Sequence, residues 1–166
     1  MRCFIGIPVP EALSAALTAV PTPTATRPVP IDNLHLTLAF LGERQHRALE
    51  PLASALQAAL RPCHAFTVPL SAVDAFPGPG GRVWAAHARQ EPALLDLHRR
   101  VWAALMAAGN EAEDRPFLPH ITLARSASPL ATTARPGPWV LPVGAVMLYH
   151  SPPDGHYRVL REWPLT

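Results

Sequence analysis

Two short segments of the sequence each carry a histidine and a threonine that are two residues apart. The first is His35-Leu36-Thr37-Leu38-Ala39, and it recurs later in the chain as His120-Ile121-Thr122-Leu123-Ala124. Because successive side chains of a β-strand point to opposite faces, each histidine shares a face with its threonine, and the aliphatic residues share the other face. Two such strands, each held by a buried apolar face, predict two histidines that face a common site.

Three kinds of chemistry could use such a pair. A metal site would need a third ligand, and no His-Glu-x-x-His pattern or cysteine pair accompanies the two histidines. A serine or cysteine nucleophile lacks support, because there is no Gly-x-Ser-x-Gly elbow and both Cys3 and Cys63 stand in apolar, strand-like segments. Acid–base displacement at phosphorus is the third, and we favour it because it uses all four repeated polar residues.

In that displacement a neutral imidazole would take a proton from water, while an imidazolium would give one to the leaving oxygen. A pKa near ~6.5 suits an imidazole to both tasks at neutral pH. The hydroxyls of Thr37 and Thr122 could donate hydrogen bonds to the phosphate oxygens as charge develops. The other histidines lack the repeated phrase and are expected to have structural or surface roles: His46, His64, His87, His98, His150 and His156.

The elements that could hold these residues follow from hydrophobic spacing and from the positions of proline and glycine. The clearest helix spans 92–108, with Pro92 in its first turn, Gly109 just past its end and one apolar stripe. Weaker helical patterns span 11–17 and 45–60, and a proline- and threonine-rich loop is expected over 21–30. Strand pairs that flank helices predict an α+β protein with largely antiparallel sheets. The predicted strands span 2–7, 34–41, 64–73, 82–88, 117–125, 139–143, 145–150 and 157–162.

Length and composition favour one packed domain. The chain has 166 residues, of which 49% are apolar and 16% charged, so we expect a single domain over 1–166, made of two lobes that correspond roughly to 1–80 and 81–166. No apolar run reaches the length of a membrane span, and the start of the chain lacks the features of a signal peptide. The two cysteines form no metal or disulfide framework. We expect reduced thiols in a cytoplasmic protein without a membrane partner.

The charge of the chain limits the kind of nucleic acid that it could hold. The formal net charge is only +2, and all 14 basic residues are arginines. An excess this small cannot drive tight, salt-sensitive binding along a long phosphate backbone. If the substrate is a nucleic acid, the protein is expected to grip one end or one nucleotide, and an arginine fork suits phosphate better than a lysine does.

With these motifs in place, the sequence resembles the 2H phosphoesterases, and specifically the bacterial and archaeal RNA 2′,3′-cyclic phosphodiesterases, also called 2′-5′ RNA ligases. The family is defined by two His-x-Thr/Ser-x motifs, which stand here within Asn33–Gly42 and Arg115–Arg125. The resemblance extends to Arg2–Pro8 at the start of the chain and to Leu148–Leu165 at its end. It therefore covers nearly the whole chain.

The resemblance implies a bilobal, pseudo-two-fold α+β fold, in which two largely antiparallel sheets face a central groove and the helices lie outside. Each sheet would contribute one His-x-Thr strand to that groove. Members of the family need no metal or other cofactor, and they open the 2′,3′-cyclic phosphate at an RNA 3′ end to leave a 2′-phosphate. Some also join tRNA halves through a 2′-5′ bond, a weak reversal of that opening. We expect a monomer that acts on such RNA ends, tRNA halves included.

Carried over residue by residue, the resemblance assigns His35 and His120 as the catalytic pair and Thr37 and Thr122 as phosphate donors. In similar enzymes the first-motif histidine protonates the departing 3′ oxygen and the second activates water, so His35 is the expected acid and His120 the expected base. Arg125 matches the family's arginine five residues after the second histidine and is expected to bind phosphate. In an ideal strand its side chain would point away from His120, so we expect a bulge or a strand end near it.

One departure from the family concerns the wall of the groove. Relatives often carry a tryptophan shortly before the first motif, where this chain reads Arg27-Pro28-Val29-Pro30. Either the groove wall differs here or another aromatic side chain replaces the tryptophan. The candidate base or groove contacts are Phe40, Phe117 and Tyr149, with Phe76 and Trp84 as further stacking candidates.

Two other functions compete with this one. A 2H enzyme could act on a small cyclic phosphate, such as an ADP-ribose cyclic phosphate, and a comparison of substrates would separate the two. The chain could also be a non-catalytic module that binds RNA ends. The presence of both histidines argues against that module, because binding alone needs no acid–base pair.

Overall fold

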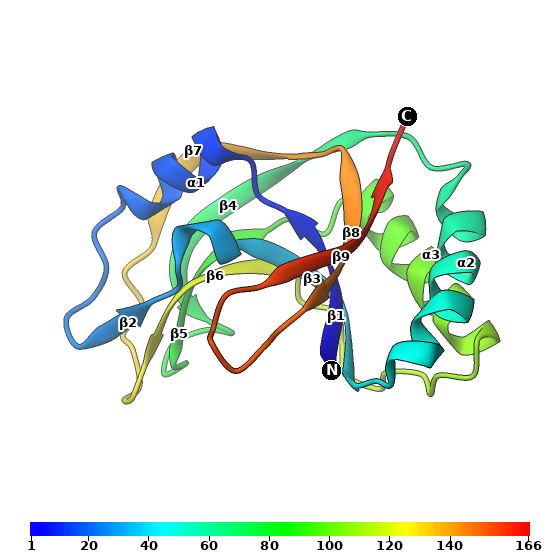
Figure 1. Cartoon of the computed structure of the whole chain (residues 1–166). Coiled ribbons are helices and arrows are strands. Elements are labelled where there is room, and N and C mark those ends of the chain that lie inside the picture. The colour runs from blue at the N-terminus through cyan, green and yellow to red at the C-terminus, as the bar shows by residue number, and fades with distance from the viewer.

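Nine β-strands and three α-helices follow one another along the chain, and the computed structural model describes all of residues 1–166 (Figure 1). The helices are α1 (Glu11–Thr18), α2 (Leu49–Leu60) and α3 (Pro92–Ala107). Single turns of 3-10 helix, Ile31–Asn33 and His46–Ala48, precede β3 and α2. The strands are β1 (Arg2–Pro8), β2 (Thr26–Pro28), β3 (His35–Glu43), β4 (Phe66–Phe76), β5 (Val83–Ala88), β6 (His120–Ser126), β7 (Arg135–Val143), β8 (Ala145–His150) and β9 (Arg158–Pro164).

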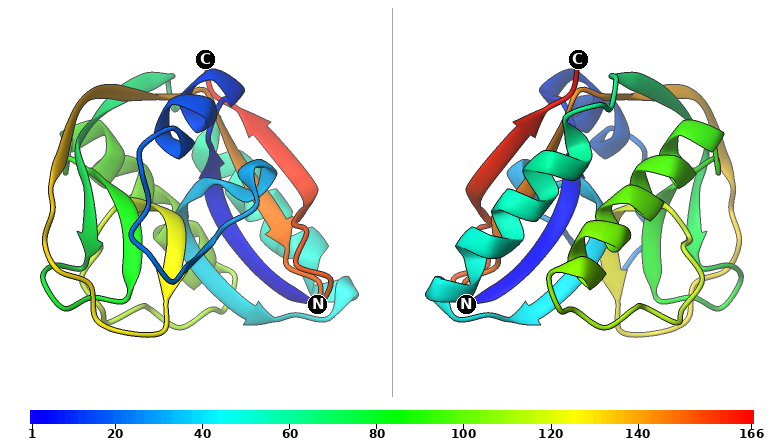
Figure 2. Two further views of the ribbon diagram at one scale, coloured as in Figure 1. Left: turned by 90° about the vertical axis from the view of Figure 1, so that its left-hand side faces the viewer. Right: turned by 90° about the vertical axis from the view of Figure 1, so that its right-hand side faces the viewer.

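All strand pairs are antiparallel and belong to one sheet, in the order β7-β4-β5-β6-β3-β1-β8-β9, with β2 beside β6. The predicted α+β class with antiparallel strands is confirmed. The two expected sheets are the two four-stranded arms of this one sheet, joined between β3 and β6 by a single residue pair, Leu36 and Ile121. The arms splay apart on either side of the joint, as the left view of Figure 2 shows.

The two motif strands carry the same irregularity. β1 flanks β3 as β5 flanks β6, and in each case one motif residue has no partner across the sheet: Leu38 in β3 and Leu123 in β6. Such a residue marks a β-bulge, which interrupts the alternation of side chains. Phe40 and Arg125, two positions further along, therefore face the same side of the sheet as the histidines. This is the bulge that the predicted role of Arg125 requires.

The opposite face of the motif strands is part of the hydrophobic core. Leu36 and Ile121, the residues of the joint, are fully buried in the same cluster as the apolar sides of α2 and α3. These two helices pack side by side across this face (Figure 2, right). The apolar stripe predicted for the helix at 92–108 is confirmed, since α3 buries Leu94, Leu97, Val101 and Leu105. With this face packed, only the histidine face of each strand is open to a ligand.

β2 lies in the segment 21–30, for which the sequence predicts a loop because proline cannot donate a hydrogen bond within a sheet. The strand forms because it is short and lies along β6 on the edge that β3 leaves free, with Thr26, Arg27 and Pro28 as the paired residues. The amide of Val29 continues the contact and donates to the carbonyl of Leu123 at 2.9 Å. β2 is therefore attached to the bulge of β6.

The other elements lie close to their predicted positions. The helix predicted over 45–60 begins at Leu49, because His46–Ala48 form a 3-10 turn, and Pro51 stands in the first turn of α2, where proline is tolerated. The second motif strand begins at His120 instead of at 117, since Pro119 has no amide to donate. None of the helices has the length and apolar character needed to cross a membrane.

Candidate active site

His35 lies at the start of β3, where two hydrogen bonds fix its ring. Its Nδ1 bonds to the carbonyl oxygen of Asn33 at 2.8 Å, and its Nε2 bonds to Thr37 Oγ1 at 2.8 Å. Phe4 lies against the ring, with the two centroids 4.6 Å apart. Because a carbonyl oxygen can only accept, Nδ1 carries the proton of the neutral ring. Nε2 is therefore the nitrogen that can gain or lose a proton.

The same hydrogen bond holds His120 at the start of β6. Its Nδ1 bonds to the carbonyl oxygen of Leu118 at 2.8 Å, so Nε2 is again the exchangeable nitrogen. Phe76 stacks on the ring, with centroids 3.7 Å apart and planes inclined by 21°. The cross-strand partner of His120 is His87, whose own Nε2 bonds to the carbonyl oxygen of Ala75 at 3.0 Å. His87 is thus anchored to β4 and does not line the groove.

A groove of about 600 Å³ runs between the two arms of the sheet. The motif residues meet in it because β3 and β6 pair at the residue that lies between each histidine and its threonine. No group of three or more histidine, cysteine or carboxylate side chains is arranged to hold a metal ion. The structure brings all five predicted polar residues to this groove: His35, Thr37, His120, Thr122 and Arg125.

The surroundings lower the pKa of both histidines. Burial lowers the pKa of His35 to about 4, against the hydrogen bond to the Asn33 carbonyl, which raises it, and the charges of His120 and Arg125 lower it further. Burial is also the largest cause of the lowered pKa of His120, followed by the charges of His87 and Arg125. Both rings are therefore neutral at neutral pH in the free protein, and a negatively charged ligand in the groove would raise both pKa values.

Asn33 is a site residue that the sequence motif alone does not single out. Its side chain is buried, and its Nδ2 donates to the carbonyl oxygen of Gly155 at 2.7 Å while its Oδ1 accepts from the amide of Tyr157 at 3.2 Å. The backbone carbonyl of the same residue holds His35. Asn33 thus ties the position of the His35 ring to the loop between β8 and β9. Only its place two residues before the histidine could have suggested this.

Four phenylalanines and Tyr157 stand at or beside the groove, and Phe4 and Tyr157 line it on the side of His35. Phe40 is 59% exposed and lines the groove, and Phe76 lines it while stacked on His120. Phe117 lies in a smaller hollow of about 300 Å³ that shares Phe40, Phe76 and His120 with the groove. It stacks on His98, with centroids 3.8 Å apart. Phe40 and Phe117, two of the predicted base or groove contacts, are therefore within the reach of a ligand.

Tyr149 and Trp84 are placed differently from what the sequence suggests. Tyr149 is buried behind Phe4, on which it stacks with centroids 4.8 Å apart, and it does not line the groove. Burial raises the pKa of its phenol to about 12. Trp84 is only 1% exposed and lies in the core. The expectation that Tyr149 contacts the groove is wrong, because its ring is stacked behind the side chain of Phe4, its cross-strand partner on β1, and Trp84 cannot stack on a ligand.

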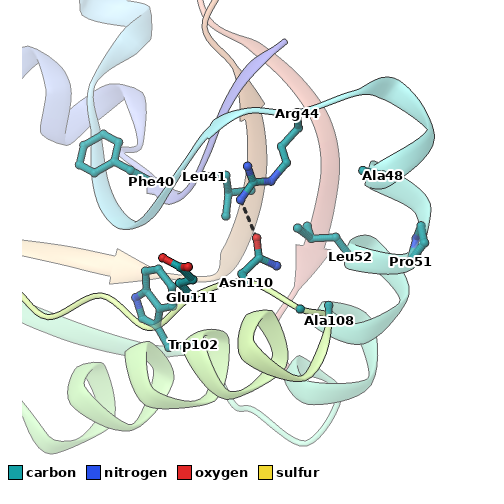
Figure 3. Close-up of a pocket in the computed structure, with 11 residues that line it drawn as sticks. Phe40, Leu41, Arg44, Ala48, Pro51, Leu52, Trp102, Ala108, Asn110 and Glu111 are labelled. Atoms are coloured by element: carbon teal, nitrogen blue, oxygen red, sulfur yellow. Dashed lines mark hydrogen bonds between the residues drawn. The ribbon is translucent and has the colours of Figure 1, made fainter.

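Another hollow, of about 490 Å³, lies between the end of β3 and the two packed helices (Figure 3). Arg44 points into it and donates from Nη2 to Asn110 Oδ1 at 2.6 Å, while Trp102 forms part of the opposite wall. Phe40 is the one predicted contact residue that lines this hollow. The polar residues predicted to do chemistry all lie in the groove instead.

Comparison with known proteins points to one family. The sequence model of the 2′-5′ RNA ligase superfamily matches residues 9–139, a range that contains both motif strands. A curated RNA 2′,3′-cyclic phosphodiesterase of Escherichia coli (strain K12) is 36% identical over 178 aligned positions, which cover 99% of this chain and 97% of that protein.

Solved structures show the same likeness over the whole fold. A crystal structure of a Thermus thermophilus protein superimposes with a TM-score of 0.85 at 34% identity, covering 99% of this chain and 98% of that one. Escherichia coli LigT, solved in complex with 3′-AMP, superimposes with a TM-score of 0.81 at 32% identity, with 99% and 98% covered. Because nearly all of this chain is covered, the likeness includes both arms of the sheet.

Proposed function

The chain belongs to the 2′-5′ RNA ligase superfamily, and we propose that it is an RNA 2′,3′-cyclic phosphodiesterase that hydrolyses cyclic phosphate ends without a metal and leaves a 2′-phosphate. The observation that carries this proposal is the meeting of two His-Thr pairs and Arg125 in a single groove, which Arg2 and Arg115 also line. The naming of the Escherichia coli relative as an RNA 2′,3′-cyclic phosphodiesterase supports the same substrate class.

In the proposed reaction the cyclic phosphate lies between the two histidines. His120 Nε2 takes a proton from a water molecule, whose oxygen attacks phosphorus, and the bond from phosphorus to the 3′ oxygen breaks. His35 Nε2 gives its proton to that 3′ oxygen, so the phosphate stays on the 2′ oxygen. Each histidine of such a pair can contribute about 10²–10⁴-fold in rate. Arg125 supplies a fixed positive charge beside the phosphate.

The hydrogen bond between His35 and Thr37 gives the threonine a role in this step. In the neutral ring the hydroxyl of Thr37 donates to Nε2 at 2.8 Å. When Nε2 is protonated it becomes the donor, and the hydroxyl of Thr37, which keeps its hydrogen, can then donate a hydrogen bond to a phosphate oxygen. Thr122 supplies the second hydroxyl of the groove. The phosphate, being negative, raises the pKa of His35 and so favours the protonated ring only when substrate is bound.

We further propose that the protein acts as a monomer in the cytoplasm on RNA 3′ ends, tRNA halves included, and that 2′-5′ joining is a weak reversal of hydrolysis. Support for the monomer comes from the groove, which takes both histidines and both threonines from one chain. We propose Phe40 and Phe117 as contacts of the base, and their positions in the spaces that open beside His120 and Thr37 support this.

The test is to incubate the purified protein with a short RNA that ends in a 2′,3′-cyclic phosphate and to compare the product with authentic 2′- and 3′-phosphate ends. Conversion to the 2′-phosphate is expected. A 3′-phosphate product, or binding without conversion, would contradict the proposal. An ADP-ribose cyclic phosphate serves as the competing substrate, and its faster turnover would move the assignment to small cyclic phosphates.

A further inference from the structure

A second arginine stands next to Arg125. Arg27 of β2 and Arg125 of β6 are directly opposite each other in an antiparallel pair, so their side chains leave the sheet on the same face. Like charges in such a pair repel and destabilise the strand pairing. Neither guanidinium forms an ion pair or a side-chain hydrogen bond within the protein. Nothing in the chain itself therefore offsets the repulsion.

The two arginines line a hollow of about 280 Å³, whose other walls are short side chains: Ala25, Thr26, Ser126 and Ala127. Arg125 lines this hollow and also the active-site groove, so the two spaces meet at its guanidinium. No carboxylate lines either space. The groove and the hollow together form one positively charged path that leads away from the two histidines.

The backbone holds Arg27 at this place. Pro28 follows it and restricts it to an extended conformation, and the amide of Val29 is bonded to the carbonyl of Leu123 at 2.9 Å. On the other side, Ala25 has a φ of 61°, in the left-handed region that a side chain disfavours. Arg27 is thus held opposite Arg125 despite the backbone strain at Ala25 and the repulsion between the two guanidinium groups.

We propose that this hollow binds a second phosphate of the substrate, with Arg27 as the residue that contacts it and Arg125 between it and the reactive phosphate. The proposal rests on the function proposed above and says how the substrate extends from the groove. An anion between two guanidinium groups turns their repulsion into two charge-assisted hydrogen bonds. In RNA this phosphate is the phosphodiester on the 5′ side of the terminal nucleotide, and a 5′-diphosphate would present the same chemistry.

The first experiment compares Arg27→Gln with the wild type on two substrates. One is a nucleoside 2′,3′-cyclic phosphate, which has a single phosphate, and the other is a dinucleotide that ends in the same cyclic phosphate. The variant should lose about tenfold more kcat/KM on the dinucleotide than on the nucleoside, as expected for one charge-assisted contact. Arg61→Gln, at an exposed arginine just past the end of α2, is the matched control and should lower neither value. An equal loss on both substrates overturns the proposal.

A dinucleotide with an uncharged methylphosphonate linkage identifies the contact. Relative to the normal dinucleotide, this substrate should lower kcat/KM of the wild type by about tenfold. It should leave kcat/KM of Arg27→Gln almost unchanged, because that variant already lacks the contact. A 5′-diphosphate on a nucleoside cyclic phosphate is the alternative source of the second phosphate. If Arg27→Gln loses more kcat/KM on this compound than on the dinucleotide, the 5′-diphosphate is the group that the hollow binds. Equal sensitivity of both enzymes to the methylphosphonate overturns the proposal.

Ligand binding gives a readout that does not depend on turnover. Adenosine 2′,5′-bisphosphate should bind the wild type about tenfold more tightly than adenosine 2′-phosphate does, and Arg27→Gln should lose most of this difference in titration calorimetry. The same difference in both proteins overturns the second-phosphate site. Absence of turnover on the nucleoside substrate, by contrast, would contradict the proposed function and leave the binding result to decide the site.

Discussion

His35 and His120 have the same hydrogen bond at Nδ1 but different surroundings at Nε2, and this difference supports different roles. The Nε2 of His35 is already bonded to the Thr37 hydroxyl at 2.8 Å. The Nε2 of His120 has no hydrogen-bond partner within the protein. A water molecule can therefore approach His120 directly, as a general base requires, while the Nε2 of His35 is oriented by its hydrogen bond to Thr37. The geometry is consistent with His35 as acid and His120 as base.

Replacing either histidine by alanine should remove most of the activity. His35→Ala and His120→Ala are each expected to lower kcat by at least about 10²-fold, because each removes one of two proton transfers. Steady-state kinetics on a cyclic-phosphate RNA measures this, and His46→Ala, at an exposed histidine outside the groove, is the control. EDTA should leave the wild-type rate unchanged. Near-full turnover by either variant, or inhibition by EDTA, would contradict the mechanism.

The pH of maximum activity should be lower than for a pair of histidines with ordinary pKa values. The base must be neutral, so activity rises as pH increases through the lowered pKa of His120. The acid must be protonated, so activity falls as pH increases through the pKa of His35, which is about 4 in the free protein. A bell-shaped profile of kcat/KM is therefore expected, with its maximum below about pH 6.5. The profile of kcat should shift to higher pH, because the bound phosphate raises both pKa values. A kcat/KM maximum above about pH 7 would refute this assignment.

At the scale of elements, the position of His35 depends on β1 as well as on its own strand. Gly6 of β1 pairs with Thr37, and a Cβ at Gly6 would lie 3.3 Å from His35 Cδ2 and 3.1 Å from the carbonyl oxygen of Leu36. Both distances are tighter than an ordinary contact. The absence of a side chain at Gly6 thus allows the imidazole to lie close over β1.

Gly6→Ala should therefore displace the His35 ring by a few tenths of an ångström and lower kcat by about tenfold, since catalysis depends on close alignment. The fold should persist with a lower melting temperature, because the new methyl group meets the backbone carbonyl of Leu36 as well as the imidazole, and both contacts need a shift of only a few tenths of an ångström. Kinetics together with thermal unfolding measures both effects. The matched control is Gly144→Ala, where an added Cβ would meet nothing within 4 Å. An unaltered kcat in Gly6→Ala would show that the ring position is not critical.

The strands that hold the site could be predicted from the sequence, but the bulges within them could not. Alternation of histidine, threonine and aliphatic residues identifies both motif strands, because burial of one face selects that pattern. A bulge is a backbone feature without a residue signature at Leu38 or Leu123, so only the suggested role of Arg125 indicated one. The contacts of Asn33 with the β8–β9 loop join residues far apart in the chain, and a local pattern cannot reveal them.

At the scale of the whole molecule, the site is located where the two arms of the sheet meet. One residue pair joins β3 to β6, and the groove opens on the face of that joint that α2 and α3 do not cover. The proposed catalytic groups of both arms are therefore brought together by the same pairing that makes the sheet continuous. The burial that supports this arrangement also keeps His35 neutral, and it makes the free energy of unfolding depend on pH.

The unfolding free energy should decrease on acidification in a way that depends on His35. Its pKa is about 4 in the folded protein and about 6.5 in an unfolded chain, so between these values the unfolded state binds a proton that the folded state does not. Stability is therefore lost as pH falls from about 6.5 to about 4, by up to about 3 kcal/mol from this group. In urea unfolding, the free energy of unfolding of His35→Gln should fall less on acidification than that of the wild type. The control His64→Gln, at an exposed position, should show the same fall as the wild type. Identical pH dependence in the wild type and His35→Gln would contradict the lowered pKa.

The central claim, that the two histidines perform different proton transfers at one phosphate, is tested most directly with a substrate whose 3′ bridging oxygen is replaced by sulfur. A thiolate leaves without protonation, so this substrate needs the base but not the acid. His35→Ala should be severely impaired on the oxygen substrate and should approach the wild-type rate on the sulfur substrate, while His120→Ala should be impaired on both. Equal impairment of the two variants on the sulfur substrate, or recovery of His120→Ala instead, would contradict the account.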